Sequence, residues 1–116
     1  MNSIKNSFEF LFKKTVDLTE KETFEIVQVI RDNLNNSFTK KDFEEKYLNN
    51  FKSYSYHGLL KLNDTIVGVY NAIPYIFGDK KKKYKIAQSV DTVIDKKIRG
   101  NPYNLKKIAD LVYENL

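Results

Sequence analysis

Two turn-forming residues, Asn63 and Asp64, constrain the fold more than any other feature of this sequence. They separate two strand-like runs, residues 54–62 and residues 65–70, the second of which is rich in β-branched side chains. Asn and Asp tolerate the positive φ angles of a tight hairpin turn. The two runs are therefore predicted to be adjacent antiparallel strands.

Three more segments have strand character. In residues 8–16, the phenylalanines at positions 8, 10 and 12 alternate with other side chains, which is the period-2 pattern of a half-buried strand. Another apolar stretch passes through Pro74 to Phe77, and a further strand is predicted over residues 84–94. Proline cannot donate to a strand ladder, so Pro74 is expected at a bulge or a sheet edge.

Three helices are predicted from their start signals. Thr19 with Glu22 forms a capping box for a helix to about residue 34, and Thr39 with Asp42 begins a shorter helix that ends near residues 49–50. The third helix begins at Pro102, after an Asn N-cap. The side chains at helical spacing are Phe24, Val27, Ile30, Arg31 and Leu34, then Phe43, Tyr47 and Phe51, and finally Leu105, Ile108, Leu111, Val112 and Leu116.

The order of elements is thus βααβββα, which indicates an α+β domain. We expect a mainly antiparallel sheet of about four strands with three helices packed on it, and a single domain over residues 1–116. The hydrophobic share of 41%, with 14% aromatic residues, is enough to fill one core.

Composition excludes several classes of site. The chain has no cysteine and a single histidine, which rules out disulfides, thiolate zinc sites and cysteine nucleophiles and argues against a histidine metal site, and no metal ligands are predicted. It has neither a secretory signal pattern nor a membrane-length apolar run, so a cytoplasmic protein without a membrane partner is expected. The net charge of +5 comes mainly from lysine and is best explained by solubility.

The junction between the last strand and the last helix could hold an anion. The first N–H groups of a helix have no internal partner, and the helix dipole adds positive potential there. Arg99 adds a cation directly before this helix start. The alternative is a plain turn, in which Gly100 relieves backbone strain and Asn101 caps the helix.

This order of elements, and above all residues 88–114, resembles the cofactor-binding region of GNAT acyl-CoA N-acyltransferases. The resemblance rests on three segments, Gln88-Ser-Val-Asp-Thr-Val93, Arg99-Gly100 and Ala109-Asp-Leu-Val-Tyr-Glu114. These segments are similar to those of family members that modify sugars or act in polysaccharide clusters. The resemblance implies that the chain transfers an acyl group from acyl-CoA, such as acetyl-CoA, to an amine, which could lie on a sugar nucleotide or a polysaccharide precursor.

The resemblance also implies a set of cofactor-binding residues. In the family the fourth strand pairs with the pantetheine arm, and the turn Q/R-x-x-G-x-G/A holds the pyrophosphate. Arg99 matches the leading position, whereas Pro102 and Asn104 stand where the motif has small residues. The residues implied are Val93, Ile94, Arg99, Gly100, Asn101, Tyr103, Asn104 and Leu105.

Two side chains are candidates for proton transfer. Asp91, on the fourth strand, is the best-placed carboxylate for a general base, although it could instead cap a loop or pair with a lysine. His57 suits proton transfer near neutral pH, but a lone strand histidine is more often a packed side chain.

A full GNAT domain continues with a further strand, a helix and a hairpin, so this chain resembles the N-terminal half. The fourth strand would then be a free edge, which predicts a homodimer or a complementing C-terminal half. One alternative function is a non-catalytic module that acts by such association. Another, less favoured, is a nucleic-acid-binding domain in which bases stack on Tyr54, Tyr56, Tyr70 and Tyr75 beside Lys80 to Lys83.

Overall fold

A computed structural model describes residues 7–78, 83–98 and 102–116 of the chain. These residues form an α+β domain with the predicted order βααβββα. Its elements are β1 (Phe8–Lys14), a 3-10 turn (Thr15–Asp17), α1 (Glu20–Asn33), α2 (Lys40–Tyr47), β2 (Tyr56–Leu62), β3 (Thr65–Gly78), β4 (Lys83–Ile94) and α3 (Pro102–Glu114). The sheet has the strand order β1-β2-β3-β4, and every neighbouring pair is antiparallel.

The hairpin turn between β2 and β3 is confirmed. Asn63 and Asp64 have φ angles of 51° and 68°, the left-handed values that such a turn requires of both residues. The turn sets the pairing of β2 with β3 and leaves the other side of β2 to β1.

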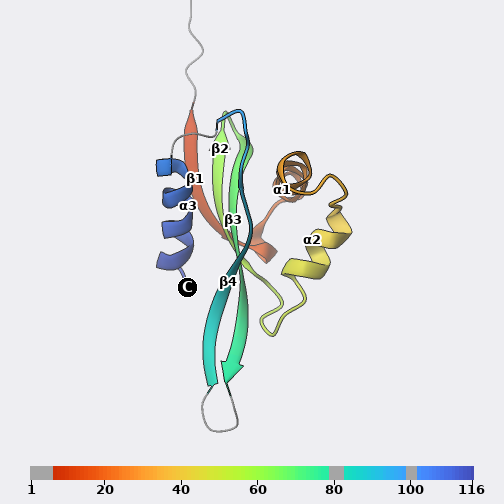
Figure 1. The fold of residues 1–116 in the computed structure, drawn as a ribbon, viewed down its shortest axis with the longest axis vertical. Helices are drawn as coiled ribbons and strands as arrows, with labels where there is room; N and C mark the ends of the chain where they lie inside the picture. Colours follow the sequence, from red (N-terminus) through yellow and green to blue (C-terminus); the bar gives the residue numbers. More distant parts are fainter. Residues whose placement is uncertain (1–6, 79–82, 99–101) are drawn as a thin grey trace, which may run out of the picture.

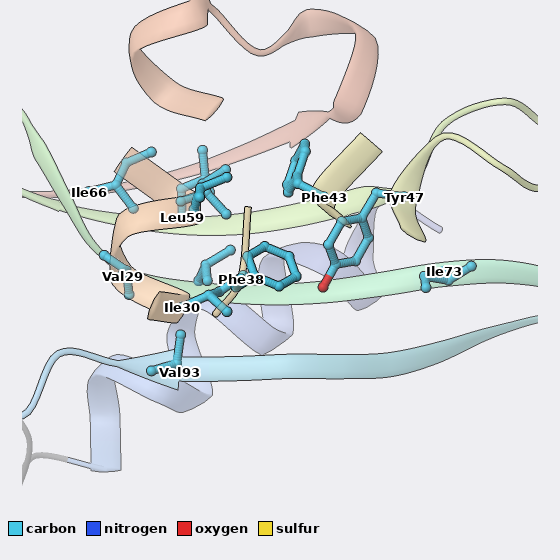
Figure 2. Close-up of a cluster of buried hydrophobic side chains, with 12 residues drawn as sticks. Val29, Ile30, Phe38, Phe43, Tyr47, Leu59, Ile66, Ile73 and Val93 are labelled. Atoms are coloured by element: carbon cyan, nitrogen blue, oxygen red, sulfur yellow. The ribbon is translucent and has the colours of Figure 1, made fainter. Parts of the chain in front are cut away.

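Helices cover both faces of the sheet (Figure 1). α3 packs on one face against β1, β2 and β3, while α1 and α2 lie on the other face. The core under α1 and α2 is drawn in Figure 2, where side chains of both helices meet inward-facing residues of β2, β3 and β4. The labelled residues of this core are Val29, Ile30, Phe38, Phe43, Tyr47, Leu59, Ile66, Ile73 and Val93.

The predicted capping box at Thr19 is present, and the predicted N-cap at Thr39 is also a capping box. The hydroxyl of Thr19 accepts from the backbone N–H of Glu22, and Thr39 and Asp42 make the same exchange at the start of α2. The Glu22 carboxylate is almost fully buried and also binds the ammonium groups of Lys13, at 2.7 Å, and Lys61, at 3.1 Å. Burial by itself raises the pKa of Glu22, but the hydrogen bonds from Lys13, the Thr19 backbone and Lys61 bring that pKa down to about 2.

The residues at helical spacing are only partly buried in the core. Phe24 is 67% exposed, and the buried face of α1 instead contains Ile26 and Val29 beside Val27 and Ile30. Phe24 lines a hollow of about 530 Å³ between α1, the β2–β3 hairpin and residues 95–98. Leu34 of the same stripe is exposed as well, and so are Phe51, Leu105 and Leu116 in the other two stripes.

β3 continues as one strand through Pro74 to Gly78, where the sequence suggested two separate stretches. The pairing of β2 with β3 ends at Ala72, so residues 73–78 pair within the described sheet with β4 alone. This two-stranded part extends away from the helices in Figure 1. Pro74 lies in it, where one side of β3 has no neighbouring strand, which confirms the expected edge position.

Candidate functional site

A β-bulge in β4 presents Asp91. Asn71 pairs with Val90 and Val69 pairs with Val93, so β4 has one residue more than β3 between these two pairs. Asp91 takes up this extra length with a φ of 49°, a left-handed value that is uncommon for a residue other than glycine. Bulges of this kind often redirect a side chain beside an active site.

The Asp91 carboxylate is held by α2. The Tyr47 hydroxyl donates to its Oδ2 atom at 2.5 Å, and the Lys46 ammonium lies 2.6 Å from the same oxygen. Burial, together with the Asp91 contact, raises the pKa of Tyr47 well above its usual range, so this hydroxyl keeps its proton. Because both partners bind Oδ2, the Oδ1 atom of this 21% exposed side chain is the oxygen that can accept a further hydrogen bond.

Behind Asp91, three buried side chains form a hydrogen-bonded chain. Asn71 donates through Nδ2 to the backbone oxygen of Asp91 at 3.1 Å, which leaves its Oδ1 to accept from Nδ1 of His57 at 2.7 Å. His57 therefore carries its proton on Nδ1, and its Nε2 accepts from the Thr15 hydroxyl at 2.7 Å. The chain ties the bulge to β2 and to the end of β1.

His57 is a core residue. Its exposed fraction is 0%, and its ring contacts those of Phe43 and Tyr47, with centroids 5.8 and 5.4 Å away. Burial lowers the pKa of His57 to about 4, although the hydrogen bond with Asn71 acts in the opposite direction. The packed interpretation of His57 is therefore the better one, because the ring is neutral at pH 7 and has no surface from which to reach a substrate.

Stability should fall as the pH drops from about 6.5 toward 4. In this window the unfolded chain protonates His57, whose usual pKa is 6.5, while the folded chain does not, so acid favours unfolding. A gap of roughly two and a half units corresponds to about 3 kcal/mol, at about 1.4 kcal/mol per unit. Glu22, with its pKa lowered from 4.5 to about 2, adds a second loss below pH 4.5.

The measurement is urea unfolding between pH 3 and 8, with NMR titration of the single histidine. The variant His57→Gln should lose the dependence above pH 4.5 and keep the one below it. A histidine signal that titrates near 6.5 in the folded protein would contradict the buried neutral ring.

A hollow of about 290 Å³ lies where the end of β4 meets the ends of two helices. It is lined by Asn33 and Leu34 at the end of α1, by Val93 and Ile94 of β4 with the adjacent Thr92, and by Leu105 in the first turn of α3. Three of the predicted cofactor-binding residues, Val93, Ile94 and Leu105, are thus brought together. α1 supplies Asn33 and Leu34, which the sequence did not suggest as site residues.

The other predicted cofactor residues have different positions. Arg99, Gly100 and Asn101 lie outside the described residues. Tyr103 is 57% exposed and stands edge-on to Phe10 of β1, outside the lining of the hollow. Asn104 is buried, so its side chain does not stand at the surface beside the helix start.

A second hollow, of about 450 Å³, is lined by Asp91 itself. Its lining is mostly polar and comes from the α1–α2 connection and from α2: Asn35, Ser37, Phe38, Asp42, Glu45 and Lys46, with Asp91 from β4. Asp91 and Thr92 are consecutive, so the two hollows are neighbours along β4. The residues that hold Asp91, namely Lys46, Tyr47 and Asn71, carry no sequence signal because they are distant in the chain.

Comparison with known proteins does not assign a family. No protein-family model matches this sequence, and no curated protein matches it significantly. Within the described residues, no three His, Cys, Asp or Glu side chains gather as a metal site would require. No helix of that part is long and apolar enough to cross a membrane.

Proposed function

We propose that this chain is a GNAT-like acyltransferase domain that uses acyl-CoA, for which acetyl-CoA is the first candidate, and transfers the acyl group to an amine. The observation that supports the proposal is the meeting of Val93, Ile94 and Leu105 in one hollow beside Asp91. The sequence places these residues in different elements, and the resemblance to GNAT enzymes is what connects them to one cofactor.

The lining of the hollow suits the pantetheine arm. Leu34, Val93, Ile94 and Leu105 offer apolar walls, and the start of α3, where Leu105 lies, adds the positive potential of a helix N-terminus for a phosphate. The thioester of the bound cofactor supplies an acyl carbon activated toward nucleophiles. Pro102 lacks an N–H group, so one donor fewer is available than in a helix that begins with another residue.

Asp91 is the proposed general base. Its Oδ1 atom accepts the proton that the amine nitrogen loses, while Tyr47 and Lys46 hold the other oxygen in place. The C–N bond forms as the C–S bond of the thioester breaks, and CoA leaves as the thiolate, which takes up a proton to give the free thiol. The amine approaches from the second hollow, where Asp42 and Glu45 favour a positively charged acceptor. Amino sugars and their nucleotide derivatives are the acceptors to test first, because the resemblance includes enzymes that modify sugars.

Isothermal titration with acetyl-CoA tests the cofactor site. The variant Leu105→Asp removes an apolar wall and adds a negative charge near the phosphate-binding end, so it should weaken binding at least tenfold. Leu116→Asp makes the same change at an exposed position at the other end of the chain's last helix, and it should leave binding unchanged. Asp91→Asn should bind acetyl-CoA but lose thiol release with an amino sugar.

No saturable binding by the folded chain would overturn the enzymatic proposal. It would favour a second candidate, a non-catalytic module that acts by association as a homodimer or with a complementing half. That candidate is supported by β4, whose outer edge pairs with no other strand of the described sheet. A mass that rises with concentration in light scattering, without acetyl-CoA binding, is the result that this candidate expects.

A further inference from the structure

Three aromatic rings and three lysines lie together beside β1, at the opposite edge of the sheet from β4. We call this surface the β1 strip and define it by Phe10, Lys14, Lys52, Tyr54, Tyr103 and Lys107. β1 contributes two of these residues, the α2–β2 connection two, and α3 the other two. Figure 1 shows α3 lying beside β1. None of these six residues lines the hollow at the end of β4 or the hollow at Asp91.

At the C-terminal end of β1, the strip combines two lysines with Tyr54. The Lys14 ammonium lies 5.0 Å from the centre of the Tyr54 ring, and the Lys52 ammonium lies 5.9 Å from it. Lys52 also donates to the hydroxyl of the buried Tyr56 at 3.1 Å, which fixes its position. Two cations are therefore held around one half-buried ring.

The part of the strip around Phe10 has one lysine beside two rings. The Lys107 ammonium lies 5.7 Å from the centre of the Phe10 ring and 6.0 Å from that of Tyr103. The two rings meet edge to face, with centroids 6.3 Å apart. Four residues of rise along β1 separate Phe10 from Lys14, which is about 13 Å.

These lysines differ from most others in the described part of the chain, because Lys14, Lys52 and Lys107 form no ion pair with a carboxylate there. By contrast, Lys13 and Lys61 share Glu22, and Lys106 pairs with Asp110. Three of the cations without an ion pair are thus placed beside aromatic rings. An acidic peptide would use the charge alone, whereas a ligand with both phosphates and flat rings uses both features.

We propose that the β1 strip binds single-stranded nucleic acid. Lys14, Lys52 and Lys107 contact phosphates, while bases stack on the rings of Tyr54 and Tyr103. Base stacking of this kind does not depend on sequence, because every base has a flat face. The site differs from the tyrosine platform expected from the sequence, since Tyr70 is buried and hydrogen-bonded to Tyr113, and Tyr75 lies in the two-stranded part of β3.

The test is fluorescence anisotropy with a labelled ten-residue oligothymidylate. Three phosphate contacts predict a slope of about −2 for log affinity against log salt, so affinity should fall about 20-fold between 50 and 200 mM salt. The double variant Lys14→Gln/Lys52→Gln should reduce this fall to about threefold. Tyr54→Leu should weaken binding about tenfold and leave the salt slope unchanged.

The matched control is Lys40→Gln/Lys41→Gln, which removes the same charge from exposed positions on α2. It should bind like the parent chain. Three results would overturn the proposal: no binding at 50 mM salt, an equal loss in both double variants, or full binding by Tyr54→Leu. Vesicles containing phosphatidylserine serve as a second probe, and binding to them in place of the oligonucleotide would assign the strip to a membrane surface.

Discussion

Gly58→Ala should lower the free energy of unfolding by about 3 kcal/mol, with a fall of roughly 10 °C in Tm. A Cβ atom at Gly58 would lie 2.2 Å from the backbone oxygen of Ile108 and 3.1 Å from a methyl group of Val112. Ile108 and Val112 form the fully buried side of α3. The backbone oxygen cannot rotate away as a side chain can, so α3 must shift from the sheet and loosen this side of the core.

Gly68→Ala is the matched control, because the same substitution there meets a different obstacle. Its Cβ atom would lie 2.5 Å from Cδ1 of Ile94, the end of a flexible side chain that can change rotamer. Thermal unfolding of both variants should therefore show a clearly smaller loss for Gly68→Ala. Equal losses would mean that the close approach of α3 to β2 does not determine the stability of this layer.

Much of the fold could be predicted because its signals are local. The capping boxes of Thr19 and Thr39 and the turn at Asn63 each depend on residues within three positions of one another. Turn and cap chemistry of this kind acts in the same way whatever the rest of the chain does. The order of elements follows from these signals and from the hydrophobic periods between them.

Burial was less predictable, because it depends on which face of a helix meets the sheet. Phe24 fits the helical spacing of α1 but points away from the core, whereas Glu22 is buried because Lys13 and Lys61 converge on it from β1 and β2. Prediction of the candidate site is limited in the same way, because the site is formed by residues that are far apart in the sequence. Asp91 was recognisable as a strand carboxylate, but its partners Tyr47 and Asn71 lie 44 and 20 positions away.

Asn71→Leu should lower the free energy of unfolding by about 2 to 6 kcal/mol, although the two side chains have the same number of non-hydrogen atoms. The change leaves the Nδ1–H group of His57 and the backbone oxygen of Asp91 buried without their partner. Each buried group that loses its hydrogen bond costs about 1 to 3 kcal/mol. The control Asn36→Leu changes an exposed residue in the same way and should have little effect on urea unfolding.

The variant Asn71→Asp separates the packing of this residue from its hydrogen bonds. It keeps an oxygen toward Nδ1 of His57, but a carboxylate there favours the protonated ring, so the pKa of His57 should rise from about 4 toward or above its usual 6.5. NMR of the only histidine reports this change directly. The backbone signals of Asp91 should move as well, since Asn71 no longer donates to its oxygen. If Asp91 keeps its signals in both Asn71 variants, the bulge is set by β4 alone, and the buried chain from Thr15 to Asn71 has no part in positioning the proposed base.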